Sequence, residues 1–154
     1  MIKIIVVGKI GKKYLTEAIE HYLKQMPIKV EVIELKDEKD ITGMQIEGKK
    51  ILDKIQPDHY VIPLVIEGKM LDSIEFSKKI DDVFTLYNKT ITFVIGGSFG
   101  LSDDVKKRGD FHLSLSKMTL PHQLARLFLI EQIYRALMIK NNHPYHKWGY
   151  YVKR

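Results

Sequence analysis

Residues 90–101 read T-I-T-F-V-I-G-G-S-F-G-L, an uncharged run that ends in a glycine-rich turn. The β-branched and aromatic residues of Thr90–Ile95 predict a strand that is buried inside a sheet. The three glycines that follow let the backbone turn tightly, and Ser102–Lys107 is expected to form a short helix. A buried strand followed by a turn and a helix is the repeating unit of α/β proteins.

The same unit recurs on both sides of this stretch. Four more strands are expected, at Met1–Gly8, Lys29–Lys36, Tyr60–Ile66 and Phe111–Leu115. Four more helices are expected, at Lys12–Gln25, at Gln45–Ile55, from a cap at Ser73 to about Tyr87, and at about Leu120–Ile139. The sequence therefore predicts one α/β domain over residues 1–154, with a mostly parallel sheet flanked by helices.

Composition excludes several classes of protein. A chain of 154 residues that is 45% hydrophobic and 29% charged is typical of one globular domain, not of a disordered or collagen-like protein. The absence of cysteine excludes disulfide scaffolds, thiol nucleophiles and cysteine zinc sites. The apolar run in Met1–Lys9 is too short for a secretory signal or a membrane span, so we expect a cytoplasmic protein with no membrane partner.

Positive charge is concentrated in the second half of the chain. The net charge is +6, and residues 78–154 carry 13 Lys and Arg against 6 Asp and Glu, whereas residues 1–77 carry 12 against 13. A localised basic surface is typical of proteins that bind a phosphate backbone. A solvated basic face without a partner is the alternative, so charge alone indicates a polyanion partner without establishing one.

The glycine turn is the first candidate ligand site. Its spacing, G-G-x-x-G from Gly96 to Gly100, matches neither the dinucleotide-binding pattern nor a P-loop. Glycines between a strand and a helix let the backbone approach a ligand closely. A tight turn with nothing bound is the alternative.

The loop at Leu115–His122 is the second candidate, again between a strand and a helix. Ser116 and Thr119 are expected to cap the helix, and Pro121 suits its first turn, but capping explains neither Lys117 nor His122. Loops at the carboxyl ends of successive strands lie beside one another, where open α/β sheets bind ligands.

The third candidate is the end of the chain, Asn142–Lys147. Its imidazoles and phenol suit proton transfer, base stacking or phosphate contact, and a frayed basic tail is the alternative. We expect no metal site, because Pro144 separates His143 from His146 and no carboxylate or cysteine cluster completes a ligand set.

The long helix is more apolar than one sheet face requires. It is expected to place Arg126, Glu131 and Arg135 away from its buried side chains. The side chains expected to be buried are Leu124, Leu127, Phe128, Ile130, Ile133, Tyr134 and Leu137. A second subunit would cover the excess apolar surface.

Six ordered blocks carry a family resemblance. They are Val6–Lys9, Ile66–Lys69, Ile95–Leu101, Ser114–His122, Glu131–Ala136 and Pro144–Lys147. In this order, and over nearly the whole chain, they resemble the ribosomal RNA large subunit methyltransferase H family.

The resemblance implies a SPOUT-class fold whose C-terminal part is tied in a trefoil knot, a topology that periodicity does not predict. It implies transfer of a methyl group from S-adenosylmethionine to N3 of a pseudouridine in 23S ribosomal RNA. The substrate would be a stem-loop of the large subunit at the subunit interface, and the enzyme would be a homodimer.

Matched residue by residue, the resemblance also assigns site residues. The residues that it assigns to cofactor binding are Leu64, Gly96, Leu115, Ser116, Lys117, Met118, Thr119 and Leu120. Substrate contact and catalysis fall to His122, Arg135, Tyr145 and His146, with the tail reaching toward the partner subunit's cofactor. Of these we favour His146 for proton transfer or orientation and Arg135 for stabilising the anion on the base.

Two departures from the family pattern keep other functions open. Val65 stands where the family usually has Asp or Glu, and Trp148–Arg154 extends the chain beyond its usual end. The alternatives are a SPOUT enzyme for another RNA, such as transfer RNA, and a catalytically silent RNA-binding dimer. A doubly wound domain that binds phosphate or flavin would leave the loop Ser116–His122 and the tail unexplained.

Overall fold

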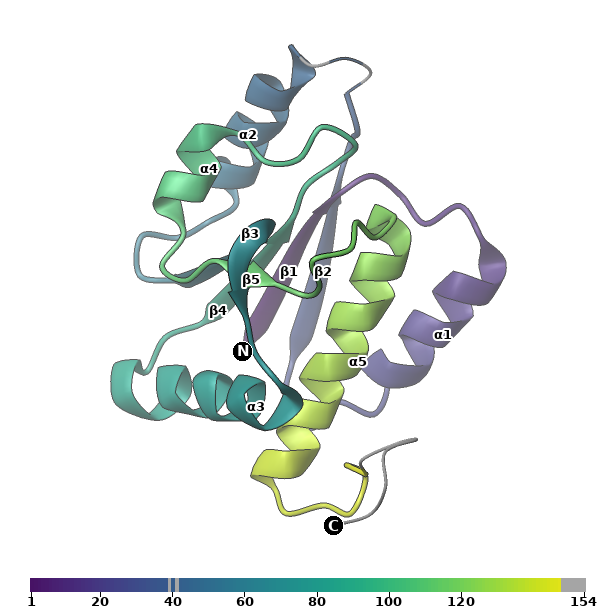
Figure 1. Cartoon of the computed structure of the whole chain (residues 1–154), viewed down its shortest axis with the longest axis vertical. Helices are drawn as coiled ribbons and strands as arrows, with labels where there is room; N and C mark the ends of the chain where they lie inside the picture. The colour runs from purple at the N-terminus through teal and green to yellow at the C-terminus, as the bar shows by residue number, and fades with distance from the viewer. Residues whose placement is uncertain (39, 41, 148–154) are drawn as a thin grey trace.

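The computed structural model of the chain describes residues 1–38, 40 and 42–147, and Figure 1 shows a central sheet with helices packed on it. The strands are β1 (Ile2–Val7), β2 (Val30–Leu35), β3 (Tyr60–Met70), β4 (Ile91–Ile95) and β5 (Leu113–Ser114), in the spatial order β2-β1-β4-β3-β5. The helices are α1 (Lys13–Leu23), α2 (Gly43–Asp53), α3 (Ser73–Asp82), α4 (Asp103–Arg108) and α5 (His122–Lys140), and the π-helical segment η1 (Val83–Tyr87) continues α3. Each neighbouring pair of these strands is parallel, which confirms the predicted mostly parallel sheet.

Two apolar cores lie on the two faces of the sheet, because side chains alternate along each strand. In β1, Ile4 and Val6 belong to the core that α1, α3 and α5 cover. Ile5 and Val7 belong to the core that α2 and α4 cover. All four side chains are at most 1% exposed, so β1 is buried on both faces, as its uncharged sequence predicts.

Two helix caps differ from the sequence prediction. Asp72, not Ser73, caps α3: the Asp72 carboxylate accepts from the Glu75 backbone N–H at 2.7 Å, and the Glu75 carboxylate accepts from the Asp72 backbone N–H at 2.8 Å. Neither Ser116 nor Thr119 caps α5, which begins at His122 without a side-chain cap. The Ser116 hydroxyl instead accepts from the Met118 backbone N–H at 3.0 Å, so it stabilises a turn within the loop.

β3 is longer than predicted and crosses closely over the chain before β5. Leu64 and Lys69 both pair with Leu113, with a break in register between them. At Gly68, an added Cβ would lie 2.8 Å from the backbone of His112 and Leu113. Only glycine therefore fits at this crossing, which brings the end of β3 against the segment that leads to α5.

α5 buries Ile130, Ile133, Tyr134 and Leu137 as predicted, but it differs from the prediction in its first turns. Leu124 and Phe128 are 46% and 43% exposed, whereas Arg126 is 3% exposed. Arg126 forms an ion pair with Glu34 and donates to the Gly8 carbonyl at 2.9 Å. The first turns of α5 lie over the end of β1, where a buried cation satisfies a free carbonyl that an apolar side chain would leave unpaired.

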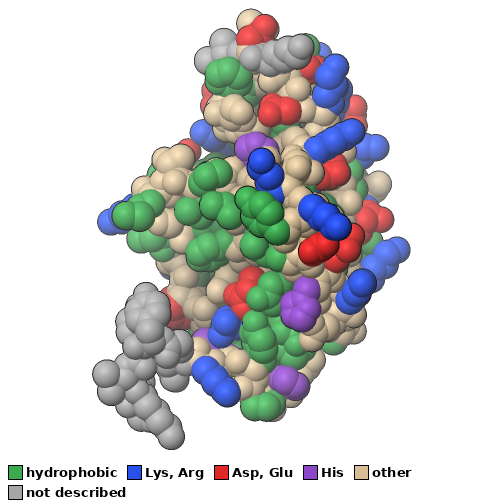
Figure 2. Space-filling model, turned by 90° about the vertical axis from the view of Figure 1, so that its right-hand side faces the viewer, with side chains coloured by type: hydrophobic (Ala, Val, Ile, Leu, Met, Phe, Trp, Pro, Cys, Tyr) green, Lys and Arg blue, Asp and Glu red, His purple; other side chains and the backbone are tan. Residues whose placement is uncertain are grey.

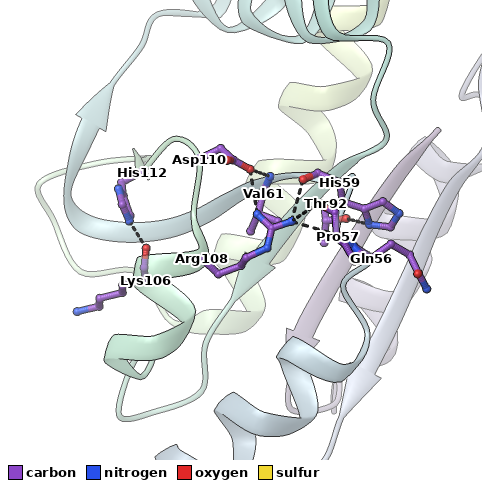
Figure 3. Close-up of polar contacts among 9 residues, drawn as sticks. All are labelled: Gln56, Pro57, His59, Val61, Thr92, Lys106, Arg108, Asp110 and His112. Atoms are coloured by element: carbon purple, nitrogen blue, oxygen red, sulfur yellow. Dashed lines mark hydrogen bonds and ion pairs between the residues drawn. The ribbon is translucent and has the colours of Figure 1, made fainter.

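A polar cluster fixes the start of β3, as Figure 3 shows. The Arg108 guanidinium donates to three backbone carbonyls of residues 56–59 at 3.0 to 3.3 Å and pairs with Asp110 at 3.2 Å. Asp110 also accepts from the Val61 backbone N–H at 2.8 Å. The buried His59 ring lies 2.9 Å from the Thr92 hydroxyl, and burial lowers the pKa of His59.

Across the described residues, none of the helices combines the length and the apolar character that crossing a membrane requires.

Candidate active site

A cavity of about 590 Å³ lies at the carboxyl end of the sheet. It is lined by the middle of β3 around Leu64, by the glycine turn after β4, and by the loop between β5 and α5. β3 lies between β4 and β5 in the sheet, so these two strands are not adjacent. Their loops nevertheless lie beside one another along this cavity, as expected, because β4 and β5 both run parallel to β3 and end at the same edge of the sheet.

Most of the residues assigned to the cofactor by resemblance line this cavity. They are Leu64, Gly96, Leu115, Ser116, Met118, Thr119 and Leu120. Lys117 is exposed and is not among the lining residues. Val65, at the position of the first family departure, lines the cavity beside Leu64.

The glycine turn leaves no room for a side chain at Gly96. An added Cβ at Gly96 would lie 2.8 Å from the carbonyl carbon and oxygen of Gly100. Gly100 itself has φ +82°, in the region that glycine adopts without strain. The turn thus presents backbone groups, and no side chain at Gly96, to the cavity.

His122 lines the same cavity, at the first residue of α5. Its ring lies against Gly8, where an added Cβ would be 3.0 Å from the ring Cε1, and Gly8 has φ +102°. His122 therefore lies against the first loop of the chain, and it does not line the cavity that Arg135 and His146 line.

Two of the other three residues assigned to catalysis, Arg135 and His146, line a second cavity of about 340 Å³, whereas Tyr145 does not line it. This cavity lies between the start of α3, β5, α5 and the tail, and its lining includes Arg135, His146 and Lys147. Ser114 and Leu115 line both cavities, so the two share one wall.

Hydrogen bonds join the tail to α5. Arg135 Nη1 donates to His146 Nδ1 at 3.0 Å, and Arg135 Nη2 pairs with Glu131 at 3.0 Å. The Tyr145 hydroxyl donates to Glu131 at 2.8 Å. Burial, and then the positive charge of Arg135, lower the pKa of His146, so its ring is neutral at pH 7.

Tyr145 is held as a phenol. Its ring packs edge-on against Tyr134 at a centroid distance of 4.8 Å, and the Arg135 guanidinium lies 4.9 Å from its ring centroid. Burial and the hydrogen bond to Glu131 raise the pKa of Tyr145 above its ordinary value. These contacts favour an anchoring role for Tyr145 over proton transfer.

Glu131 is a site residue that sequence reasoning placed on the helix without a role. Its spacing from Arg135, i to i+4, is the signal for a helical ion pair.

Within residues 1–38, 40 and 42–147, no group of His, Asp or Glu side chains suits a metal ion.

Apolar side chains remain exposed on α5 and in the loop before it. Leu124 and Phe128 are 46% and 43% exposed on α5, and Met118 is 78% exposed in the preceding loop. Figure 2 shows hydrophobic side chains gathered in the middle of one face, with Lys, Arg and His side chains around them. Such a patch is typical of an interface.

Comparisons with known proteins agree on the class of enzyme. The family model described as "Predicted SPOUT methyltransferase" matches residues 1–146. The chain is 58% identical to a protein of Acholeplasma laidlawii (strain PG-8A) named "Ribosomal RNA large subunit methyltransferase H", and the match covers 95% of this chain and 99% of that protein. It is 50% identical, with the same coverage, to a protein of that name from Clostridioides difficile (strain 630).

A solved structure extends the likeness to the fold. "The structure of a probable methylase family protein from Haemophilus influenzae Rd KW20" matches with a TM-score of 0.57 at 15% identity, over 95% of this chain and 70% of that chain. The extension Trp148–Arg154 lies beyond the family match and outside the described residues.

Proposed function

The chain belongs to the ribosomal RNA large subunit methyltransferase H family of SPOUT methyltransferases, and from this membership we propose that it methylates N3 of a pseudouridine in 23S ribosomal RNA. S-adenosylmethionine supplies the methyl group. Family membership also implies the trefoil knot in the C-terminal part of the chain. With this substrate, we propose that the enzyme acts in the cytoplasm, with the large subunit or the assembled ribosome as its partner.

One observation carries this proposal. Seven of the eight residues assigned to the cofactor come from three separate segments of the chain, and they line a single cavity of about 590 Å³. That volume lies in the range of small-molecule sites. The backbone at Gly96 carries no side chain, because a Cβ there would collide with Gly100, and a bare backbone suits close contact with adenine and with the methionine moiety. Lys117, exposed on the same loop, is assigned to the rim.

Methyl transfer requires alignment and removal of one proton. The N3–H of the pyrimidine would lose its proton to a general base, and the nitrogen would take the methyl group from S-adenosylmethionine, which would leave as a neutral thioether. Arg135 stabilises the negative charge that develops on the base. His122, beside the cofactor cavity, and Tyr145, which anchors the tail, contribute to substrate contact.

His146 serves proton transfer or orientation, and its hydrogen bond favours orientation. Arg135 can only donate, so His146 Nδ1 must accept and is occupied. Single-turnover methylation by H146N and H146Q distinguishes the roles, because Asn places an acceptor near the Nδ1 position and Gln near the Nε2 position. Activity in H146N alone supports orientation. Loss of activity in both supports proton transfer, and a rate near wild type in both removes His146 from the chemistry.

A homodimer completes the proposed site. Arg135 and His146 line the second cavity of their own subunit, not the cofactor cavity. We propose that the exposed apolar side chains of α5 and its preceding loop pack against a second copy. The tail of one subunit would then reach the cofactor cavity of its partner.

The decisive test supplies labelled S-adenosylmethionine and three substrates that lack the modification: assembled ribosomes, free large subunits and naked RNA that includes transfer RNA. Label in 23S RNA at a pseudouridine supports the proposal, and label only in assembled ribosomes places the reaction late in ribosome maturation. Label in transfer RNA alone identifies a different substrate. Absence of label in every substrate overturns the enzymatic proposal.

A further inference from the structure

Glu131 accepts four hydrogen bonds on its carboxylate. Oε1 accepts from Gln132 Nε2 at 3.0 Å and from Arg135 Nε at 3.4 Å. Oε2 accepts from Arg135 Nη2 at 3.0 Å and from the Tyr145 hydroxyl at 2.8 Å. A carboxylate offers about four lone-pair positions, so these bonds use the acceptor capacity of Glu131 within the protein itself.

The partners of Glu131 join two parts of the chain. Arg135 lies one turn later on α5, whereas Tyr145 lies in the tail beyond the end of that helix. Arg135 extends the connection to His146, to whose Nδ1 it donates at 3.0 Å. One side chain thus fixes a helix-borne cation relative to a tail-borne imidazole.

Glu131 acts from behind the cavity wall. Arg135, His146 and Gln132 line the second cavity, but Glu131 does not. The Ser73 hydroxyl donates to Gln132 Oε1 at 2.8 Å, so the same network reaches the start of α3 on the other side of the cavity. Glu131 therefore holds lining residues without touching what the cavity contains.

We propose that Glu131 is a positioning residue, which holds Arg135 and His146 in the arrangement that methyl transfer needs; this inference rests on the proposed function. Its charge matters as well as its geometry. Burial and the charge of Arg135 lower the pKa of His146, and the carboxylates of Glu131 and Asp72 oppose that change. Without the negative charge of Glu131, the positive charge of Arg135 acts on His146 with less opposition, so the pKa of His146 falls further.

The test compares Glu131→Gln with Glu17→Gln in the full chain. Glu17 is the matched control, because it also forms an i, i+4 ion pair, with Lys13, but its side chain is 63% exposed on α1. In E131Q we expect the single-turnover rate at saturating RNA to fall about 10- to 100-fold, because misplacement of a catalytic group by about 1 Å can cost about 100-fold. Binding of S-adenosylmethionine, measured by calorimetry, should stay within about twofold of the control, since a tenfold change needs about 1.4 kcal/mol.

A second readout does not depend on activity. In NMR titrations of labelled histidine, His146 of E131Q should titrate at lower pH than in wild type, whereas E17Q should leave it unchanged. The acid side of the pH–rate profile should move in the same direction. A purely structural role for Glu131 would lower thermal stability without moving either titration.

The outcomes separate this inference from the proposed function. A rate for E131Q equal to that of E17Q, with an unchanged His146 titration, overturns the positioning role. Failure of wild type to methylate any RNA overturns the proposed function, and the titration still decides whether Glu131 sets the state of His146. If E131Q does not fold, Tyr145→Phe removes one of the four bonds but keeps the ring contacts. We expect it to lower the rate about threefold to tenfold, and an unchanged rate would count against the inference.

Discussion

The two cavities share a wall but are built differently. The cofactor cavity is formed by backbone turns, such as that at Gly96, where the room for one atom decides the shape. The second cavity is bordered by a charge network that runs from Glu131 through Arg135 to His146. We therefore expect substitutions that add bulk to disable the first cavity, and substitutions that remove charge to disable the second.

The sharpest test of the backbone-built cavity is Gly96→Ala. Its Cβ would lie 2.8 Å from the Gly100 carbonyl, so the turn must open, and we expect affinity for S-adenosylmethionine to fall about 100-fold or more, or about 2.7 kcal/mol. Calorimetry measures this change. Gly11→Ala is the matched control, because an added Cβ there meets nothing within 4 Å. Equal affinities in the two variants would contradict the steric account.

Arg135→Met tests the charge-built cavity. We expect the single-turnover rate at saturating RNA to fall about 100-fold, since loss of one stabilising group costs about 3 kcal/mol in transition-state energy. Affinity for S-adenosylmethionine should not change. Lys140→Met, on the same helix, removes an ion pair with Asp81 at 3.5 Å and should leave the rate unchanged. Parallel losses of rate and cofactor affinity in R135M would erase the distinction between the cavities.

The pH dependence of the rate sharpens the comparison further. Burial and Arg135 lower the pKa of His146, so the neutral ring that accepts from Arg135 persists as the pH falls through the ordinary histidine value of about 6.5. We expect a flat rate near pH 7 and a loss of about tenfold per pH unit only below that lowered pKa. Single-turnover rates between pH 5 and 8 measure this limb. If the loss of rate at low pH persists in H146N, a group other than His146 causes it.

The smallest effect is expected from Lys117→Gln. Lys117 is exposed and does not line the cofactor cavity, so affinity for S-adenosylmethionine should stay within about twofold, well under the 1.4 kcal/mol of a tenfold change. If Lys117 contacts phosphate, the slope of log affinity for RNA against log salt should decrease by about 1. Cofactor titrations and RNA binding at several salt concentrations check both statements. A large loss of cofactor affinity would place Lys117 inside the cavity after all.

The sequence was informative where one residue type dominates the local geometry. The uncharged run at Thr90–Ile95 and the glycines after it predict a buried strand and a turn, and the structure contains both. The i, i+4 spacing of Glu131 and Arg135 is also present in the sequence, although Glu131 was given no role from the sequence alone. Local sequence predicts such features because the interactions that form them are local.

The remaining features depend on contacts between distant segments. Gly68 is required because the chain near Leu113 passes over it, and no pattern around Gly68 announces that crossing. Arg126 is buried because Glu34 and the Gly8 carbonyl lie beneath it, although helical periodicity alone placed it away from the core. The cap of α3 is different, because it is local: Asp72 and Glu75 have the spacing of a capping box, which the prediction of Ser73 as the cap overlooked.

The shared wall has a thermodynamic consequence. Leu115 borders both cavities, so a displacement of its side chain by an occupant of one changes the shape of the other. Such coupling is reciprocal. If bound RNA changes the affinity for the cofactor by some factor, the bound cofactor changes the affinity for RNA by the same factor. A substitution at Leu115 would then change the cooperativity between the two ligands, and product release as well as binding would respond to it.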